Sequence, residues 1–381
     1  MDYDVMSRLR KAFALIAKGL MQKEKMLEDH PKQYPYAPCL YHGINMFLAL
    51  TYEVGEAGVE IFQDADEHAF FERYLRKPIS EWFHAWKPEI LERFSIKEQE
   101  FCRFDEAFAF SRGENYYCAS GACAEFLEAQ EANIIEGTDE RILYEFLKQL
   151  SQDDYCSLRQ YIIEHPVITL DEHRELLREY SANRIAQDAI RHAYEQFEEQ
   201  AYRCSDCGWT MKKMKYGLVC HSSYCNTSQQ PLEICRKWDG TIEGIYRLKK
   251  GVMRYFSVPG KPELEIALFC KKQKLDAFLW PEHDKYDLEI RFPDGDVWEI
   301  DVKAYHSPWL LKRYFENKGG FPTGKYQRGF VVIPDNLTRH ESKYTDIVDE
   351  ALEKQENVCC LKMRTLKMEI KRKAASNGEE E

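Results

Sequence analysis

YDLEIRFPDGDVWEIDVKAY, residues 286–305, is the stretch that decides the fold of the C-terminal half. Two runs rich in β-branched and aromatic residues flank the turn sequence PDGD, so the stretch predicts a β-hairpin. Successive side chains of a strand point to opposite faces. Ile300 and Val302 therefore point together into a core, and the residues that alternate with them share the other face.

That other face carries charge. Glu299, Asp301 and Lys303 are each two positions apart on the second strand, and the hairpin brings Asp287, directly before the first strand, beside Asp301. Two carboxylates and an ammonium group then converge at one end of a sheet. Alternatively, these charges are only the solvated face of an exposed hairpin. Glu299 and Glu289 offer further acids nearby, which leaves the choice of site carboxylates open.

The pattern resembles the PD-(D/E)xK superfamily, the restriction-endonuclease-like nucleases. In this resemblance Asp287 corresponds to the first acid, Asp301 to the (D/E) and Lys303 to the lysine. Three neighbouring segments resemble, more narrowly, the nucleases encoded beside prokaryotic PIWI-like and helicase genes. They are PGxPEL at 259–264, LWPxxDxYDL at 279–288 and WxIDVK at 298–303.

The resemblance implies a metal-dependent endonuclease that hydrolyses phosphodiester bonds of DNA, in prokaryotic defence against phage or plasmid DNA together with partner proteins. Hard oxygen ligands select Mg²⁺ or Mn²⁺, which Asp287 and Asp301 are expected to hold. Lys303 is expected to position the attacking water and to offset charge on the phosphate. Glu263 matches an acid that some superfamily members add, although it is equally explained as a helix-start acid favoured by the macrodipole.

A second motif lies upstream, in RCSDCGWTMKKMKYGLVCHSSYCN, residues 203–226. Its cysteines follow the spacing C-x2-C, twelve residues, C-x4-C, which is typical of a zinc ribbon with four thiolate ligands. These cysteines are Cys204, Cys207, Cys220 and Cys225. His221 is an alternative to Cys220. Four protein ligands leave no open position, so the predicted Zn²⁺ is structural.

Two groups of basic residues are candidates for contact with a nucleic-acid backbone. The first lies between the cysteine pairs and comprises Lys212, Lys213 and Lys215, for which a solvated hairpin tip is the alternative interpretation. The second lies in the connector before the nuclease region and comprises Arg247, Lys249, Lys250 and Arg254.

Charge is distributed unevenly along the 381 residues, although the net charge is −12. Residues 1–200 hold 22 Lys and Arg against 38 Asp and Glu, whereas residues 201–381 hold 31 against 27. Nucleic acid is therefore expected to meet the second half. The acidic first half is expected to face protein partners, for which the resemblance suggests PIWI-like or helicase proteins.

Periodicity predicts an all-α domain over residues 1–202, including a helix over 96–110 and one long helix over 170–202 with Thr169 and Asp171 as its candidate caps. A zinc ribbon and connector follow at 203–246. The nuclease domain is predicted at 247–370, as a mixed sheet flanked by helices, and a disordered tail at 371–381. No stretch is apolar enough to span a membrane and no secretory signal is evident, so a cytoplasmic location is expected and the 13 cysteines are read as thiols or metal ligands.

Two other functions compete with the DNA endonuclease. One is a non-catalytic adaptor that binds nucleic acid through the zinc ribbon and an inactive nuclease fold. The other is an RNA nuclease, because the phosphate chemistry is shared. The complete acid-acid-lysine set favours an enzyme over the adaptor.

Overall fold

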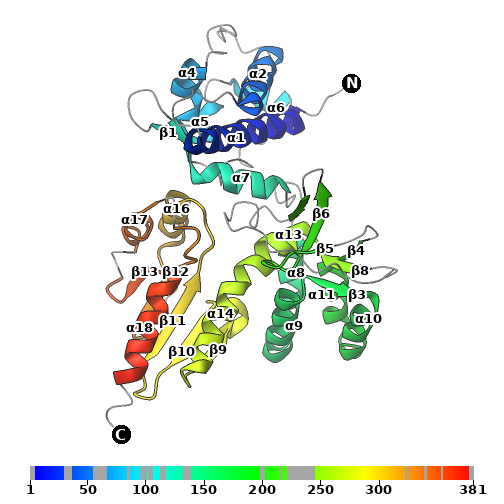
Figure 1. The fold of residues 1–381 in the computed structure, drawn as a ribbon, viewed down its shortest axis with the longest axis vertical. Helices are drawn as coiled ribbons and strands as arrows, with labels where there is room; N and C mark the ends of the chain where they lie inside the picture. Colours follow the sequence, from blue (N-terminus) through cyan, green and yellow to red (C-terminus); the bar gives the residue numbers. More distant parts are fainter. Residues whose placement is uncertain are drawn as a thin grey trace. The chain divides into compact units, whose positions relative to one another are not determined.

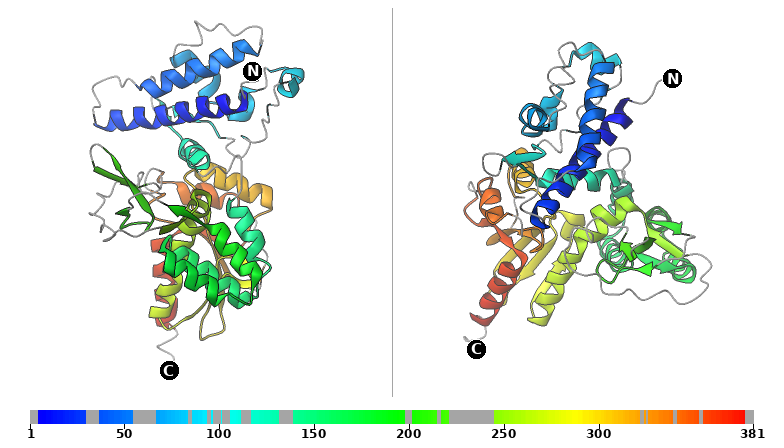
Figure 2. Two further views of the ribbon diagram at one scale, coloured as in Figure 1. Left: turned by 90° about the vertical axis from the view of Figure 1, so that its right-hand side faces the viewer. Right: turned by 45° about the horizontal axis from the view of Figure 1, so that its top comes forward.

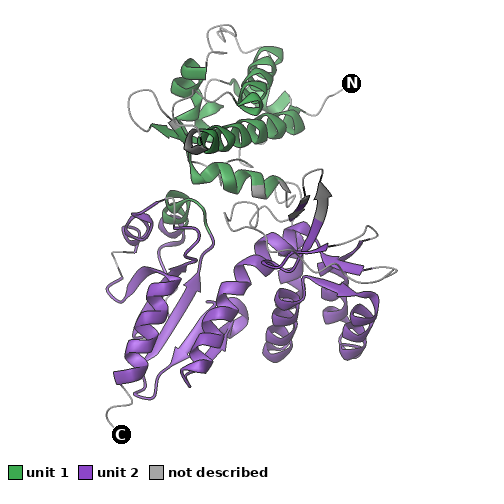
Figure 3. Cartoon of the chain, viewed as in Figure 1, with its two compact units in different colours: residues 1–130, 305–314 green, residues 131–304, 315–381 purple. Residues whose placement is uncertain are grey.

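The computed structural model (Figure 1) describes residues 5–29, 37–54, 67–83, 86–93, 96, 101, 106–111, 117–131, 139–197, 202–214, 217–220, 245–321, 324, 326–338, 341–352 and 355–376. The chain divides into two compact units, coloured in Figure 3. Unit 1 comprises Met1–Gln130 and Tyr305–Tyr314, and unit 2 comprises Glu131–Ala304 and Phe315–Glu381. The division at residue 130 differs from the predicted boundary at 202.

Unit 1 is built on two helices that pack along each other, α1 (Val5–Asp29) and α2 (Pro38–Glu53), seen in blue in Figure 2. A Cβ on Gly19 would lie 2.2 Å from the backbone nitrogen of Leu40, and one on Gly43 would lie 2.7 Å from that of Ile16. The two backbones can therefore approach this closely only because glycine occupies both positions.

Shorter elements follow in the described part of residues 1–131. They are α4 (Glu67–Phe70), the π-helix η1 (Phe71–Leu75), α5 (Ile79–Trp82), α6 (Pro88–Arg93), the strands β1 (Ala109–Ser111) and β2 (Tyr117–Ala119), and α7 (Gly121–Glu131). β1 and β2 pair antiparallel, so the predicted helix over 96–110 is wrong at its C-terminal end. Strands of three residues are too short to give a detectable alternation in sequence.

Unit 2 begins with four helices and strands drawn from distant parts of the sequence. The helices are α8 (Asp139–Leu147), α9 (Gln152–Glu164), α10 (Leu170–Glu179) and α11 (Arg184–Ala193). The strands are β3 (Val167–Thr169), β4 (Tyr194–Phe197) and β8 (Ile245–Leu248), which form an antiparallel sheet in the order β3-β8-β4. The prediction that residues 1–202 are all-α is therefore wrong, because β3 and β4 pair with a strand that lies beyond that range.

The predicted long helix over 170–202 is also divided. Thr169 caps α10 as expected, through a reciprocal capping box with Glu172. The chain then leaves the helix, and Asn183 starts α11 by accepting a hydrogen bond from the backbone of Ala186 at 3.2 Å. β4 follows directly after α11, where the prediction continued the helix.

The cysteine segment forms a small antiparallel sheet, in the order β5-β6-β7. Its strands are β5 (Tyr202–Arg203), β6 (Thr210–Met214) and β7 (Gly217–Cys220). Trp209 is buried in the same core as Leu158 of α9 and Trp280, and its ring N–H donates to the carbonyl of Leu248 at 3.0 Å. The segment therefore shares a large hydrophobic core with the helices before it and is not an isolated miniature fold.

The C-terminal part of unit 2 is a five-stranded mixed sheet in the order β13-β12-β11-β10-β9. The first three strands of this sheet in chain order, β9 (Asp276–Leu279), β10 (Leu288–Arg291) and β11 (Val297–Val302), pair antiparallel with one another. β12 (Arg328–Ile333) and β13 (Val358–Lys362) add in parallel. The predicted mixed sheet is confirmed.

Helices precede, connect and follow the strands of this sheet in the chain. A connector of α13 (Lys250–Val252) and the π-helix η4 (Met253–Ser257) leads into α14 (Val258–Lys272). α15 (Pro281–Asp284), α16 (Pro308–Lys318), α17 (Tyr344–Asp349) and α18 (Met363–Ser376) follow. α14 and α18 contact each other and cover one face of the strands (Figure 1).

The tail prediction is wrong for residues 371–376, which are the last turns of α18. Met363, Leu366 and Ile370 are buried against the sheet at helical spacing, and this burial stabilises a helix whose other positions are mostly charged. Residues 377–381 lie outside the described part.

Among the residues that the structure describes, no helix has both the length and the apolar character needed to cross a membrane.

Candidate active site

The hairpin places Asp287 and Asp301 together. Leu288 pairs with Ile300, so the next position outward sets Asp287 opposite Asp301. The backbone N–H of Asp287 donates to the carbonyl of Ile300 at 3.0 Å, and the N–H of Val302 donates to the Asp287 Oδ2 at 2.5 Å. The predicted convergence of the two acids is thus found in the structure.

The charged face of β11 is buried and not solvated. Glu299 is 3% exposed and Asp301 is 4% exposed, because other parts of the chain cover this face, among them the backbone at Gly324 over Glu299. Ile300 and Val302 lie in the core on the opposite face, as predicted. An exposed hairpin with a solvated charged face is therefore excluded.

Lys303 follows β11 directly. Its backbone N–H donates to the carbonyl of Val332 at 2.9 Å, and its ammonium group forms an ion pair with Asp301 Oδ1. The second carboxylate oxygen of Asp301, Oδ2, is buried and accepts no hydrogen bond from the residues that the structure describes. A buried anionic oxygen without a donor is suited to a cation.

Glu263 joins the site from α14. It lies in the second turn of that helix and is 3% exposed, so its position is not that of a solvated helix-start acid. Its Oε2 accepts hydrogen bonds from the indole of Trp280 at 2.5 Å and from the guanidinium of Arg159 at 3.1 Å. Burial raises the pKa of Glu263 to about 7, although the positive charge of Arg159 opposes the rise.

Asp287 lies at the centre of this charge cluster. Burial raises its pKa well above the usual value, and the negative charges of Glu263, Asp301 and Asp284 raise it further. The ammonium group of Lys303 acts in the opposite direction. Carboxylates whose pKa values are raised by burial and by one another occur at catalytic and metal sites, because a bound cation offsets the repulsion.

Arg159 and Asp284 are site residues that the sequence analysis missed. The guanidinium of Arg159, on α9, forms ion pairs with Glu263 at 3.1 Å and with Asp284 at 2.6 Å. Arg159 is 2% exposed. Asp284 stands in the LWPxxD segment and was visible as a motif residue, but nothing in the pattern of α9 distinguishes Arg159 from a surface arginine.

The alternative acids have other neighbours. A Cβ on Gly324 would lie 2.2 Å from a carboxylate oxygen of Glu299, so the loop backbone passes directly over that side chain. Glu289 accepts a hydrogen bond from the hydroxyl of Tyr286 at 2.7 Å and pairs with Arg291 at 2.6 Å. The contacts of Glu289 favour Asp287 and Asp301 over it as the paired acids, whereas Glu299, buried on the same face as Asp301, stays an alternative.

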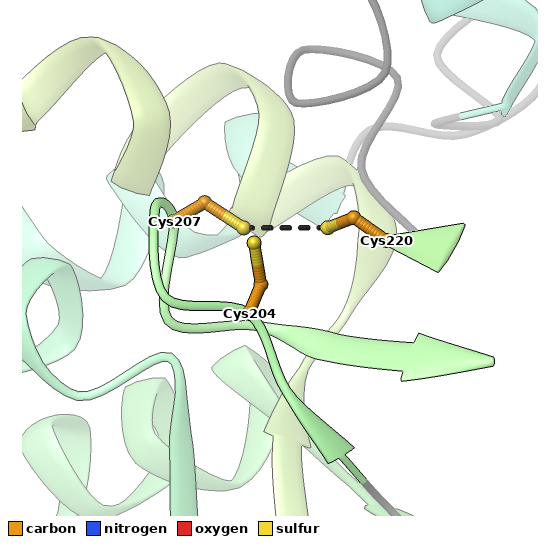
Figure 4. A group of neighbouring side chains, drawn as sticks. All are labelled: Cys204, Cys207 and Cys220. Carbon is orange, nitrogen blue, oxygen red and sulfur yellow. Dashed lines mark hydrogen bonds between the residues drawn. The ribbon is translucent and has the colours of Figure 1, made fainter. Parts of the chain in front are cut away.

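A thiol cluster lies elsewhere in unit 2 (Figure 4). The sulfur atoms of Cys204, Cys207 and Cys220 lie within 4.8 Å of one another, and all three residues are buried. The sulfurs of Cys207 and Cys220 are 3.5 Å apart. Soft thiolates converging in this way fit a Zn²⁺ ion. Cys225, the predicted fourth ligand, and the alternative His221 lie outside the described residues.

The predicted nucleic-acid contacts do not form a single exposed patch. Arg247 is paired with Glu195 at 2.7 Å and stacks 4.2 Å from the ring centroid of Phe197, and Arg254 is buried. These two arginines serve internal contacts, which argues against the predicted role for them. Lys250 is exposed and Lys249 is half-buried. Of the first group, the backbones of Lys212 and Lys213 lie in β6, and Lys215 lies outside the described residues.

Residues 260–378 match the family described as "REase associating with pPIWI_RE". This part of the chain is a restriction-endonuclease-like domain of the kind linked to pPIWI modules. The match includes the sheet, α14 with Glu263, and the residues from Asp287 to Lys303, and it confirms the resemblance seen in sequence. No curated protein and no solved structure shows a significant match to the chain.

Proposed function

We propose that the restriction-endonuclease-like domain is a Mg²⁺- or Mn²⁺-dependent endonuclease that hydrolyses DNA. The observation that carries the proposal is the excess of buried negative charge around Asp287. Four carboxylates gather here, those of Asp287, Glu263, Asp284 and Asp301. The cations seen to face them are Lys303, paired with Asp301, and Arg159, which is shared by Glu263 and Asp284. Buried charges in such excess call for a cation ligand, and hard carboxylate oxygens select Mg²⁺ or Mn²⁺.

Asp287 and Asp301 would hold the metal ion, and Glu263 is the candidate third acid. The ion, when bound, offsets charge on the phosphate and lowers the pKa of a water molecule. Lys303 stays paired with Asp301 and points its charge at the same end of the sheet. We assign to Lys303 the orientation of the attacking water and the stabilisation of the phosphate as negative charge develops on it.

A second metal, Zn²⁺, is proposed for Cys204, Cys207 and Cys220, with Cys225 as the fourth ligand. The convergence of three buried thiols supports it. Its role would be structural, because the cluster is embedded in the core that also contains Trp209 and Trp280.

The biological setting is proposed from the family description, which names an association with pPIWI_RE. We infer that the protein acts in defence against foreign DNA with a pPIWI-type partner, and that the acidic residues 1–200 offer the protein-binding surface. Lys249 and Lys250 remain the proposed contacts to the nucleic-acid backbone, with the lysines of the cysteine segment.

The test is cleavage by the full chain. Purified protein is incubated with plasmid DNA, linear DNA and single-stranded RNA in Mg²⁺, in Mn²⁺ or in EDTA, alone and with the pPIWI-type partner. Cleavage of DNA that EDTA abolishes supports the proposal. Cleavage of RNA alone would assign the same site to an RNA nuclease. Binding without cleavage under every condition would favour the adaptor.

A further inference from the structure

One face of α9 contacts the restriction-endonuclease-like domain although it lies outside residues 260–378. Gln152, Cys156 and Arg159 are four and seven positions apart, so they lie on the same side of the helix. Ile163, one turn further on, occupies the space that a Cβ on Gly260 would fill, at 2.3 Å. The glycine of the PGxPEL motif therefore allows α14 to pack closely against α9.

The segment that α9 contacts has an unusual backbone. Residues 280–284 link β9 to the hairpin, and four of them have positive φ angles although none is glycine. The angles are 50° for Trp280, 51° for Glu282, 57° for His283 and 76° for Asp284. L-residues resist this left-handed conformation, which persists only where surrounding contacts impose it.

Gln152 supplies two of those contacts. Its amide nitrogen donates to the carbonyl of Trp280 at 2.9 Å, and its amide oxygen accepts from the backbone N–H of His283 at 3.0 Å. The ring of His283 lies 2.9 Å from the carbonyl of Leu150, and the thiol of Cys156 lies 3.4 Å from the carbonyl of Leu279. Both ends of the left-handed segment are thus held by α9 and the residues before it.

Arg159 connects this segment to the acids. Its guanidinium bridges Asp284 and Glu263 and stacks over the ring of Trp280, 4.5 Å from the centroid. The indole of Trp280 donates to the same Glu263 oxygen, and the backbone N–H of Trp280 donates to the carbonyl of Asp287 at 2.9 Å. A shift of Arg159 would therefore reach both Glu263 and Asp287.

We propose that the α9 face is a working part of the nuclease site, and that Arg159 is a positioning residue. It fixes the orientation of Glu263 and holds the left-handed segment that sets the place of Asp287. The inference rests on the proposed function for its catalytic consequence. It also means that residues 260–378 by themselves form an incomplete site.

Full-length Arg159→Met, Arg159→Lys and Leu158→Ala are compared with the unmutated protein. Leu158 is a fully buried neighbour on α9 whose loss weakens the same core without a polar contact to the site. Three quantities are measured: the urea midpoint, kcat and KM for DNA with Mn²⁺, and hydrogen exchange of the peptide covering residues 279–288 in EDTA. The exchange measurement needs neither metal nor activity.

Arg159→Met should lower kcat about 10- to 100-fold with little change in KM, since supporting contacts have effects of this size. It should also speed exchange of residues 279–288 by about 10-fold or more. Arg159→Lys keeps the charge but cannot bridge both acids, so it should show a smaller loss of both. Leu158→Ala should lower the urea midpoint yet leave kcat within about 2-fold of the unmutated rate. In this variant, hydrogen exchange of residues 279–288 should not speed up more than exchange in the rest of the core.

If Arg159→Met matches Leu158→Ala in kcat and in the exchange of residues 279–288, the inference is overturned while the proposed function stands. If Arg159→Met does not fold, Arg159→Lys decides, and unchanged kcat and unchanged exchange in that variant would overturn it. If the unmutated protein never cleaves, the proposed function fails, and the exchange measurement alone decides whether α9 holds the segment.

Discussion

In unit 1, the buried ammonium group of Lys23 is matched by the buried carboxylate of Glu67, which also accepts a hydrogen bond from Tyr41 at 2.7 Å. In unit 2, the buried carboxylates around Asp287 outnumber the cations that face them. The first arrangement is an internal ion pair that needs nothing more. The second crowds like charges, which raises the pKa of Glu263 and Asp287, and perturbed carboxylates of this kind mark a candidate ligand site. The balance of buried charge therefore separates a structural pair from a functional cluster.

The largest expected effect tests the unbalanced cluster. Asp287→Asn and Asp301→Asn should each reduce DNA cleavage by about 1,000-fold or more, equivalent to about 4 kcal/mol, because each removes a proposed metal ligand. Asp287→Asn should not lower the urea midpoint in EDTA, since it removes one of several mutually repelling charges, whereas Asp301→Asn also breaks the ion pair with Lys303 and should cost some stability. A large loss of stability by Asp287→Asn in EDTA would show that this acid is structural and would contradict the contrast with Lys23 and Glu67.

Two variants on the same strand sharpen that test. Lys303→Ala should lower kcat about 100-fold yet keep Mn²⁺ binding, measured by calorimetry, because its proposed contacts are to water and phosphate. Glu299→Gln should stay within about 10-fold of the unmutated rate. If Asp301→Asn cleaves DNA at the normal rate and Glu299→Gln loses cleavage, the site acid on β11 is Glu299, two residues before Asp301 on the same face.

The balanced pair of unit 1 should respond in the opposite way. Lys23→Met leaves Glu67 buried without its cation and should cost about 3–5 kcal/mol of unfolding free energy in urea. The double variant Lys23→Met/Glu67→Leu should recover most of this loss, because an apolar pair of similar volume replaces the ions. As a control, Arg8→Gln, which breaks the more exposed pair with Glu53, should cost less than about 1 kcal/mol. Failure of the double variant to recover would contradict the balanced-pair interpretation.

The thiol cluster gives a smaller expected change, confined to unit 2. Elemental analysis of the purified protein should find one Zn²⁺ per chain, and Cys207→Ser should remove most of it. We expect a loss of about 2–3 kcal/mol in stability, less than in free zinc-finger peptides, because the segment also packs on a large core. Cys156→Ser, which changes a thiol outside the cluster, should retain the metal. Zinc-free protein from zinc-supplemented growth would contradict the assignment.

The smallest expected effect concerns pH in unit 1. Glu106 accepts a hydrogen bond from the Ser307 hydroxyl, and burial raises its pKa to about 7. Its contribution to stability is present below its unfolded pKa and is lost as pH rises through about 7. Glu106→Gln should therefore stabilise the protein by about 1 kcal/mol at pH 8 and not at pH 5, as measured by urea unfolding at both values. An equal effect at both pH values would show that Glu106 does not titrate in this range.

Much of the nuclease domain was predictable because its signals are local. The alternation in 286–305 and the turn PDGD specified the hairpin, and the hairpin register alone placed Asp287 beside Asp301. Lys303 follows from the same period of two. The cysteine spacing likewise predicted the cluster of Cys204, Cys207 and Cys220. In each case, residues close in sequence determine the geometry, so the sequence pattern predicted both the local structure and the chemical groups that it brings together.

The first half was predicted less well because its strands depend on distant partners. β3 and β4 become strands by pairing with β8, and no alternation within three or four residues announces this. α18 was missed altogether, because charged residues surround its apolar positions. Burial of β11 on both faces was also hidden, since Glu299 and Asp301 look like solvent-facing residues until distant parts of the chain, such as the backbone at Gly324, cover that face.

The sequence by itself determined the hairpin, the pair of acids with their lysine, and the thiol spacing, because covalent proximity and strand geometry fix these within a few residues. Only the tertiary structure decided which charges are buried and what opposes them. Arg159 and Glu263 are 104 positions apart, and no local pattern brings them together. The packing of α9 against α14, made possible at Gly260, creates that contact and turns a motif into an enclosed charge cluster.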